Sequence, residues 1–488
     1  MISLPEAVFE WAAQQPHKTA LVYNEGAHSY RWFADAIATA RGAFAAEGLA
    51  GAGVVVLAIS NLVDFWVASL ALRSLGLTGV LIPNVDALPG LGLPDIRAVV
   101  TTPNETWPGL TQACAGAGLP RLVTNLRGAA PLGLTDGPQH RDGGFSLLTS
   151  GTTGAARKVL NEAAWEAEFL RRRWEIIEAG RDSVVAMFEL APSTGTGYRN
   201  PAGAWFAGAT AVFDQGRGPH QCLRHPGLTH ATIVPPVLAR VLAAPPDAFP
   251  RSEILRLSVT SGTITRAQIA ETKARVTPHL FNWLGSTETQ ITAHTRIEMD
   301  DDHRWHRLLP GVEVVDNHDL PVAPGEVGRM RVSVAGGPDR YWREPENTAA
   351  FFRGGYFYPG DLARSRADGR IALQGRETSV INVGGWKVSP EPAEEQLREA
   401  LSVTGACLVS AQDAAGEERL HLVLETPAPL PLERVGPALR AALPGWDEVS
   451  VHFTTELPRN ALGKLLRRAV TDRLIAARIA GDGPAPAL

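Results

Sequence analysis

Short, continuous apolar runs alternate with amphipathic helical patterns over roughly the first 260 residues of the chain. Apolar runs of this kind are typical of buried strands, and apolar positions that recur every three or four residues are typical of helices packed on a sheet. The alternation predicts βαβ units and a mainly parallel sheet with helices on its faces. We expect strands at 19–23, 54–59, 79–82, 98–101, 144–148, 183–188, 209–213, 231–234 and 257–260, and early helices over the opening segment, 30–47 and 62–75.

The pattern changes at about residue 304, where short strands separated by turn signals replace the long alternation. The stretch 312–334, VEVVDNHDLPVAPGEVGRMRVSV, predicts a small barrel-like β segment. A further unit follows Arg376, with a helix expected at 391–401 and strands at 406–410 and 421–425. The predicted fold class is α/β, with a large N-terminal domain of stacked αβ sheets plus the β segment, residues 1–376, and a small α+β C-terminal domain, residues 377–488.

Composition narrows the class of partner. The chain has 488 residues, enough for two to four domains of ordinary size, and its 46 basic and 51 acidic side chains give a formal net charge of −5. Proteins that bind nucleic acid usually carry a net positive face, so we expect no nucleic acid partner. Lysine is rare, because 41 of the 46 basic residues are arginines; the five lysines are Lys18, Lys158, Lys273, Lys387 and Lys464.

Signals for export or membrane insertion are not visible in the sequence. The N-terminal segment MISLPEAVFEWAAQQ has no basic region followed by an apolar core, as a secretory signal would have. The most apolar stretch, 54–83, is interrupted by Asn61, Asp64 and Arg73, which is typical of a buried core. The three cysteines, Cys114, Cys222 and Cys407, form no CxxC pair that would indicate a zinc site or a disulfide framework. We predict a cytoplasmic protein with no membrane partner.

The strongest local motif is a loop rich in glycine and hydroxyl groups that follows a predicted strand. Gly151 and Gly154 allow a tight turn with outward-facing N–H groups, and nearby hydroxyls and two cations supply further donors. This set suits a polyphosphate, although the same composition is also common in ordinary solvent loops, and the spacing is not that of a Walker A loop. The candidate phosphate-binding residues are Thr149, Ser150, Gly151, Thr152, Thr153, Gly154, Arg157 and Lys158.

Four more motifs follow in order along the chain. Gly285-Ser286-Thr287-Glu288 places a hydroxyl and a carboxylate beyond a glycine turn, which is a fitting place for a magnesium ion that bridges phosphates. Asp361 is suited to accept hydrogen bonds from two ribose hydroxyls, and Arg376 supplies a cation nearby. The last two motifs are the glycine loop NVGGWKVSP at 382–390 and the segment PRNALGKLLR at 458–467.

Together these motifs resemble those of the acyl-adenylate-forming (AMP-binding) enzyme superfamily, most closely its acyl-CoA synthetases. TSGTTG resembles the family's phosphate loop, LGSTE its aromatic-Gly-x-Thr-Glu motif, YPGD its ribose motif, GRETSVINVGGWKVSP its hinge and glycine loop, and PRNALGKLLR its C-terminal lysine motif. The resemblance covers essentially the whole chain. It implies binding of ATP, Mg²⁺ and coenzyme A, with Gly285 and Ser286 in the ATP site, Thr287 on the α-phosphate, Glu288 as the metal ligand, Asp361 on the ribose, Arg376 on the ribose or phosphate, and Lys464 on the reacting carboxylate and α-phosphate.

The resemblance also implies two half-reactions. A carboxylate attacks the α-phosphorus of ATP to form an acyl-adenylate and pyrophosphate, and a thiol then attacks the acyl carbon and expels AMP. In this family the small C-terminal domain is mobile and rotates about a hinge just after Arg376. The rotation exchanges Lys464 for the loop that lines the coenzyme A tunnel, here Gly384, Gly385, Trp386 and Lys387.

The acid pocket is the least determined part of the resemblance. Its expected lining includes small residues that leave room for a ring or a medium chain, and no aspartate lies where amino-acid-activating relatives hold the α-ammonium group. We therefore expect an aryl or medium-chain acid. The predicted pocket residues are Ser193, Thr194, Gly195, Tyr198 and Gly262.

Several alternatives stay open at the level of sequence. Arg157 occupies the position where the family usually has lysine, and Lys158 follows it, so either cation could serve the phosphates. The acyl acceptor could be coenzyme A, a separate carrier protein or an amine, and a non-catalytic nucleotide or acyl binder is a further reading. The sequence does not predict the oligomeric state.

Overall fold

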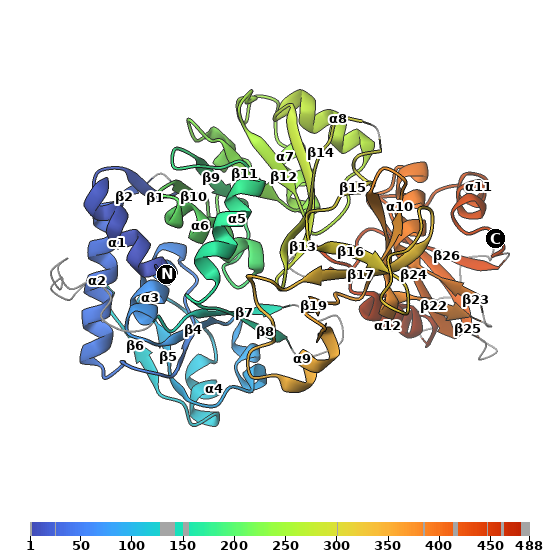
Figure 1. Ribbon diagram of the computed structural model, residues 1–488. Helices are drawn as coiled ribbons and strands as arrows, with labels where there is room; N and C mark the ends of the chain where they lie inside the picture. The colour runs from blue at the N-terminus through green and yellow to red at the C-terminus, as the bar shows by residue number, and fades with distance from the viewer. Residues whose placement is uncertain are drawn as a thin grey trace.

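Two large sheets stack with helices between them and on their outer faces (Figure 1). The computed structural model describes residues 2–24, 26–126, 142–149, 156–299, 301–383, 386–412, 418–446, 448–459 and 463–479. The eight-stranded sheet has the order β14-β13-β12-β11-β9-β10-β1-β2. Its strands are β1 (Thr19–Tyr23), β2 (Gly26–Ser29), β9 (Val184–Met187), β10 (Thr210–Phe213), β11 (His230–Ile233), β12 (Arg256–Val259), β13 (His279–Ser286) and β14 (Gln290–Arg296).

The six-stranded sheet has the order β6-β5-β3-β4-β7-β8. Both sheets are parallel except at the pairs β1–β2, β13–β14 and β7–β8, which are antiparallel. The mainly parallel arrangement that the alternating pattern predicted is therefore present twice. The strands of the six-stranded sheet are β3 (Val54–Leu57), β4 (Thr78–Leu81), β5 (Ile96–Thr101), β6 (Arg121–Val123), β7 (Phe145–Thr149) and β8 (Arg157–Asn161).

The main apolar core lies between these two sheets. Alternation along β3 sends Val55 and Leu57 into this core and sends Val54 and Val56 to the opposite face, which α4 covers. Helices α1, α2, α3, α5 and α6 pack in the middle layer, and α7 and α8 cover the outer face of the eight-stranded sheet (Figure 1). Their bounds are α1 (Leu4–Gln14), α2 (Tyr30–Ala46), α3 (Leu62–Ser74), α4 (Leu110–Gly116), α5 (Glu166–Ile176), α6 (Gly195–Phe206), α7 (Pro235–Leu242) and α8 (Arg266–Arg275), with short 3₁₀ turns at Val85–Ala87, Pro89–Leu91 and Gln221–Arg224.

A seven-stranded antiparallel sheet follows, in the segment where the sequence predicts a barrel-like unit. Among the residues that the structure describes, β15, β16 and β18 each pair with only one other strand of this sheet, and no closed ring of strands is formed. Its elements are β15 (His306–Arg307), β16 (Val312–Val315), β17 (Val327–Ser333), α9 (Pro345–Phe351), β18 (Phe352–Arg353), β19 (Tyr356–Phe357), β20 (Asp361–Ser365) and β21 (Arg370–Arg376).

The chain after Arg376 forms an α+β unit with its own core. Leu422 and Leu424 of its central strand pack against α10 and α11, whereas Val423 packs on the other face, where α12 lies. The predicted division at residue 376 stays a prediction. The elements are a 3₁₀ turn at Glu377–Ser379, β22 (Ile381–Val383), β23 (Trp386–Val388), α10 (Pro390–Leu401), β24 (Gly405–Gln412), β25 (Glu418–Glu425), α11 (Leu432–Ala442), β26 (Val449–Thr454) and α12 (Arg467–Ile479).

The predicted α/β class and the stacked sheets are confirmed. In the part of the chain that the structure describes, no helix has both the length and the apolar character needed to cross a bilayer.

Candidate active site

The Gly-Ser-Thr-Glu motif lies where β13 turns into β14. Strand β13 ends at Ser286 and β14 begins at Gln290, so Thr287 and Glu288 occupy the turn itself. A side chain at Gly285 would overlap with the carbonyl oxygen of Gln290, next to a shift in the register of the two strands. Glycine at this position therefore permits the close approach that presents Thr287 and Glu288 at the end of the sheet.

Glu288 is held by a residue that the sequence did not point to, Tyr341. Glu288 is 7% exposed, and the Tyr341 hydroxyl donates a hydrogen bond to its Oε1 at 2.6 Å. Burial, together with the charge of Glu288, raises the pKa of Tyr341 well above its usual value, so the phenol remains a donor. A buried carboxylate beside the Thr287 hydroxyl is an all-oxygen donor set, and these residues therefore fit a magnesium ion.

Arg157 and Lys158 are consecutive in β8 and have different partners. Arg157 Nη1 donates to the Tyr341 hydroxyl at 2.8 Å, and its guanidinium lies 4.1 Å from the centre of the Phe351 ring. Lys158 pairs with Glu344, with 2.6 Å between Nζ and Oε1, and is 7% exposed. Arg157 is therefore the cation of this pair that contacts the Tyr341–Glu288 hydrogen bond, and its phosphate role stays a prediction. The geometry does not support the predicted ATP-binding role of Lys158, because its ammonium group is used in a buried ion pair.

Asp361, Arg376 and Lys464 come together beside Glu288. Arg376 Nε lies 3.0 Å from Asp361 Oδ1. The pKa of Asp361 is raised because burial outweighs the opposing charges of Arg376 and Lys464. The pKa of Lys464 is lowered by burial and by Arg376, against the attraction of Asp361 and Glu288. Four charged side chains from separate segments therefore interact electrostatically at one place.

The C-terminal lysine motif is seated against the larger part of the molecule. Gly463 has φ +78°, and a side chain there would overlap with the ring of Pro236, in the first turn of α7. Only glycine combines this backbone conformation with so close an approach. The contact places the neighbouring Lys464 next to residues that precede it by more than a hundred positions.

Helix α10 supplies a second contact between the C-terminal unit and the rest of the chain. Arg304 Nη2 lies 2.6 Å from Glu399 Oε2, and Arg304 Nε lies 3.2 Å from Glu395 Oε1. On the same stripe of the helix, Arg398 Nη2 donates to Thr263 Oγ1 at 3.1 Å. These ion pairs and hydrogen bonds join α10 to two segments of the larger part of the chain.

Three of the predicted acid-pocket residues lie near the Gly-Ser-Thr-Glu turn or the start of α7. Thr194 caps α6 by accepting a hydrogen bond from Gly197 N at 3.1 Å, and a Cβ on Gly195 would lie 3.2 Å from Thr287 Oγ1. A Cβ on Gly262 would lie 3.0 Å from the ring of Pro235. Glycine at positions 195 and 262 thus permits the close approach of Thr287 and Pro235. The pocket role of Ser193 stays a prediction.

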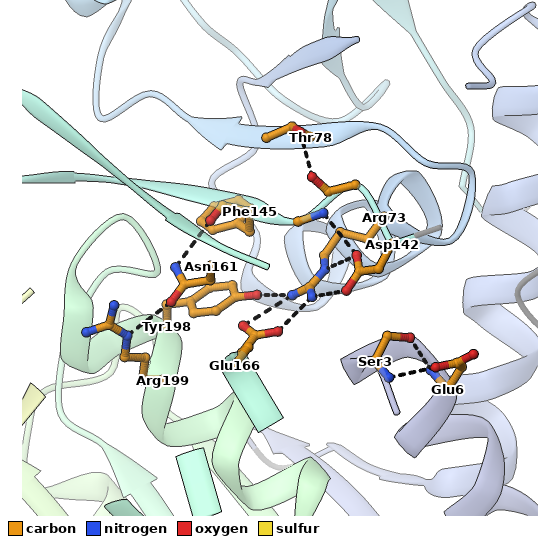
Figure 2. Close-up of polar contacts among 12 residues, drawn as sticks. Ser3, Glu6, Arg73, Thr78, Asp142, Phe145, Asn161, Glu166, Tyr198 and Arg199 are labelled. Atoms are coloured by element: carbon orange, nitrogen blue, oxygen red, sulfur yellow. Dashed lines mark hydrogen bonds and ion pairs between the residues drawn. The ribbon is translucent and has the colours of Figure 1, made fainter. Parts of the chain in front are cut away.

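Tyr198 is not a pocket residue, and the prediction for it is wrong. Its side chain has no exposed surface, stacks on Phe145 with 4.7 Å between the ring centres, and accepts a hydrogen bond from Arg73 (Figure 2). It faces inward because α6 turns this position toward the core between the two sheets. Arg73 also pairs with two carboxylates, Asp142 and Glu166, so Tyr198 belongs to a buried charge cluster.

The neighbouring Arg199 connects this interior to the active-site turn. It is buried, its Nη1 donates to the carbonyl oxygen of Thr287 at 2.5 Å, and its Nε donates to Asn161 Oδ1 at 3.1 Å. Burial lowers the pKa of Arg199 to about 10, so it is charged at neutral pH. Like Tyr341, it was missed because nothing in the local sequence marks a buried arginine as a support for a distant turn.

Several predicted site residues lie outside the part of the chain that the structure describes. They are Ser150, Gly151, Thr152, Thr153 and Gly154 of the phosphate loop, and Gly384 and Gly385 of the glycine loop. Thr149 is the last residue of β7, directly before that loop. In β23, Lys387 is exposed, whereas the side chain of Trp386 is outside the described set. The predicted roles of these residues stay predictions.

Comparison with known proteins gives a family match for the middle of the chain and a shared fold for nearly all of it. Residues 122–342 match the family model described as "AMP-binding enzyme". The structure aligns with o-succinylbenzoate coenzyme A synthetase of Bacillus subtilis in complex with ATP and magnesium ion, with a TM-score of 0.82, 18% identity, and coverage of 95% of this chain and 98% of that one. The family match thus covers residues 122–342, and the fold of the chain is that of this solved structure.

Other relatives differ in what their names say they do. The amide bond synthetase McbA from Marinactinospora thermotolerans aligns with a TM-score of 0.81 and 20% identity over 96% of this chain and 99% of that chain. Two of the sequence relatives, each 29% identical to this chain, are named as synthetases. They are the probable non-canonical nonribosomal peptide synthetase CymA of Salinispora arenicola, matched over 72% of this chain and 5% of its own length, and triostin synthetase I of Streptomyces triostinicus, matched over 67% and 64%. The chain thus spans less than two thirds of the length of these curated relatives.

Proposed function

We propose that this chain activates a carboxylic acid with ATP to form an acyl-adenylate and then transfers the acyl group to the thiol of coenzyme A. The observation that carries the proposal is the meeting of Lys464 with Asp361, Arg376 and Glu288. Lys464 of the C-terminal unit interacts electrostatically with two carboxylates, Asp361, suited to a ribose, and Glu288, suited to a metal ion. Arg157 and Glu288 both hydrogen-bond to the Tyr341 hydroxyl. This is the arrangement that an anionic acid and a polyphosphate need before they can react.

Each charged group has a separate part in the first step. The acid oxygen attacks the α-phosphorus, the bond to the β-phosphate breaks, and its electron pair leaves with pyrophosphate. Lys464 reduces the repulsion between the two anions and stabilises the charge that develops on the phosphoryl oxygens. Asp361 fixes the ribose, and Glu288 would hold Mg²⁺, which neutralises phosphate charge when it is bound.

The pocket chemistry supports an aryl or medium-chain acid. Gly195 and Gly262 add no side-chain bulk beside Thr287 and Pro235, and residues 193–197 provide no carboxylate for an α-ammonium group. The aligned coenzyme A synthetase is named for an aromatic acid, which agrees with this choice. Coenzyme A is the proposed acceptor, and magnesium the proposed metal.

A second candidate keeps the adenylation step and changes the acceptor. The similarity to an amide bond synthetase and to a nonribosomal peptide synthetase favours an amine or a carrier-protein thiol as the alternative acceptor. The exposed Lys387 lies in the segment proposed to line the thiol tunnel and is compatible with either thiol.

The test has two stages. ATP–pyrophosphate exchange is measured across aryl, medium-chain and α-amino acids, and thioester formation with coenzyme A is then followed for the acids that support exchange. We expect exchange with an aryl or medium-chain acid and a coenzyme A thioester of the same acid. Exchange without thioester, together with transfer to an amine or a carrier protein, favours the second candidate, and nucleotide binding without exchange for any acid contradicts both.

A further inference from the structure

A pocket lined by four arginines adjoins the predicted ribose pair of Asp361 and Arg376. Its wall includes Arg376 and Gly360 of the ribose site and Arg157 of β8, together with residues from β17, α9 and β18 that no motif singles out. Two of those residues are arginines, Arg329 and Arg353. The pocket therefore extends the active site into a part of the seven-stranded sheet with no assigned role.

The charge in this pocket is unbalanced. Arg157, Arg329, Arg353 and Arg376 line it, and Glu377 is the one carboxylate among its described lining residues. Four guanidinium groups in one concave wall repel each other unless anions lie between them. An excess of arginine in a pocket is the usual basis for binding phosphate groups, because the planar guanidinium donates two parallel hydrogen bonds to phosphate oxygens.

Arg329 is incompletely satisfied by protein partners. Its buried Nε has no hydrogen-bond partner, and the nearest carboxylate oxygen, Glu377 Oε1, is 3.7 Å from it. That distance allows charge attraction but is too long for a hydrogen bond. A buried donor without a partner costs free energy, and the one hydrogen bond recorded for this guanidinium runs from Nη2 to the carbonyl oxygen of Asp316 at 3.3 Å. The guanidinium therefore keeps N–H groups for a further acceptor.

Arg353, a second arginine of the pocket wall, is oriented by an aromatic ring. Its guanidinium lies 3.6 Å from the centre of the Tyr358 ring, and its Nη2 is 4.0 Å from Asp319 Oδ1. Tyr358 is fixed in turn, because its hydroxyl donates to Asp319 Oδ1 at 3.0 Å. Stacking on the ring orients the guanidinium while leaving its N–H edges available to an anion.

We propose that this pocket binds inorganic pyrophosphate, the leaving group of the adenylation step, through Arg329 and Arg353 together with Arg157 and Arg376. The inference rests on the proposed function for the source of pyrophosphate and deepens it. Arg157 and Arg376 border both the nucleotide site and the pocket, so a pyrophosphate that separates from the α-phosphate remains in contact with cations as it moves. Arg329 then exchanges its weak contact with Glu377 for a hydrogen bond to the leaving group.

The phosphate chemistry has a second source, the phosphates of coenzyme A. Both ligands would use the same guanidinium groups, so the experiment must separate them. Pyrophosphate is favoured because Arg157 and Arg376, which flank the reacting phosphates in the proposed first step, form part of the same wall.

The test uses the full chain and three single variants, Arg329→Gln, Arg353→Gln and the control Arg340→Gln. Arg340 is an exposed arginine between β17 and α9 that does not line the pocket. Titration calorimetry with magnesium pyrophosphate should give a Kd that is about tenfold higher for each pocket variant and unchanged for the control. Thermal unfolding checks that each variant is folded; the Arg353 side chain is 46% exposed, so its replacement leaves the core intact.

Kinetics then distinguish the outcomes. In ATP–pyrophosphate exchange we expect the KM for pyrophosphate to rise about tenfold in both pocket variants, with the KM for ATP within about twofold of the parent value. An unchanged Kd and KM for pyrophosphate in folded variants overturns the inference. The KM values for coenzyme A and 3′-dephospho-coenzyme A are compared in the same variants. If the parent prefers coenzyme A and the variants do not, the pocket binds the coenzyme A phosphate, and the inference is overturned. If no acid supports exchange but the variants still weaken pyrophosphate binding, the proposed function fails and the pocket assignment stands.

Discussion

Two clusters of buried charge in this molecule have opposite electrostatic character. In the first, Arg73 lies between Asp142 and Glu166, and the three side chains are 0%, 3% and 0% exposed. Figure 2 shows both carboxylates in contact with the guanidinium. Burial alone would lower the pKa of Arg73, but the two carboxylates raise it well above its ordinary value. The charged form of Arg73 is therefore stabilised by its two carboxylate partners.

The second cluster is the one around Lys464. There burial raises the pKa of Asp361 and lowers that of Lys464, so each charged form is disfavoured despite the opposite charges nearby. The Asp361 and Arg376 side chains are 26% and 35% exposed, so this cluster is open to a ligand. Buried charges that are fully paired stabilise this fold. Buried charges that are only partly compensated mark the place where a charged ligand is to bind.

The largest effect is expected at Lys464. The variant Lys464→Ala should lower the rate of ATP–pyrophosphate exchange about 100- to 1000-fold, because it removes a cation at the position where negative charge develops. Its thermal unfolding midpoint should stay close to that of the parent. Lys273→Ala, which removes a lysine from α8 on the surface, serves as the matched control and should exchange at the parent rate.

The first cluster should respond in the opposite way. Replacing Glu166 with glutamine leaves Arg73 with one carboxylate in a site that water does not reach, and the free energy of unfolding should fall by about 3–5 kcal/mol. Denaturant titration measures the change. Glu168→Gln on the same helix removes an exposed carboxylate that pairs with Arg171 and Arg172, and it should leave stability almost unchanged. Equal effects of the two variants would contradict the assignment of the Arg73 cluster to stability.

Consecutive residues of β8 allow the same comparison within one strand. Arg157→Gln should raise the KM for ATP about tenfold, because it removes a cation next to the proposed nucleotide site. Arg157 is joined to that site by its hydrogen bond to Tyr341, which in turn bonds Glu288. Lys158→Gln should instead lower the unfolding midpoint, because it leaves Glu344 buried without its cation. A reversed pattern, with the KM for ATP changed by Lys158→Gln and not by Arg157→Gln, would return the phosphate role to Lys158.

The smallest expected effect is a shift in a pH profile. The pKa of Lys464 is lowered from 10.5, chiefly by burial and then by Arg376. Adenylation needs the protonated lysine, so its rate should decline with rising pH at values below 10.5. In Arg376→Gln the neighbouring cation is removed, the pKa of Lys464 rises, and the alkaline limb should move to higher pH. A limb that stays in place would show that Arg376 does not act on Lys464.

The sequence predicted the elements whose patterns are local. Strand β1 and helix α3 were expected within a residue of their observed bounds, since continuous apolar runs mark both and the Asn61 cap stands at the start of α3. Strand β8 and helix α5 were missed. Polar Arg157 and Lys158 open β8, and α5 contains the run Arg171–Arg173, so long-range partners decide both elements.

The same distinction applies to the candidate site. Asp361, Arg376, Glu288 and Lys464 could be singled out because each stands in a motif that resembles the family. Tyr341 and Arg199 stand in no such motif and act through contacts with residues far along the chain, so only the folded structure identifies them. Tyr198 shows the reverse error. It was predicted to line the pocket because it lies close to Gly195 in sequence, but the helix turns its side chain into the core.

The measurement that tests the central claim most directly compares the two half-reactions in Lys464→Ala. Adenylation is followed by ATP–pyrophosphate exchange, and the second step is followed by thioester formation from a supplied acyl-adenylate and coenzyme A. The account predicts that exchange is almost abolished while the rate of thioester formation stays within a few-fold of the parent value. Equal loss of both rates, or exchange that persists without Lys464, would contradict it.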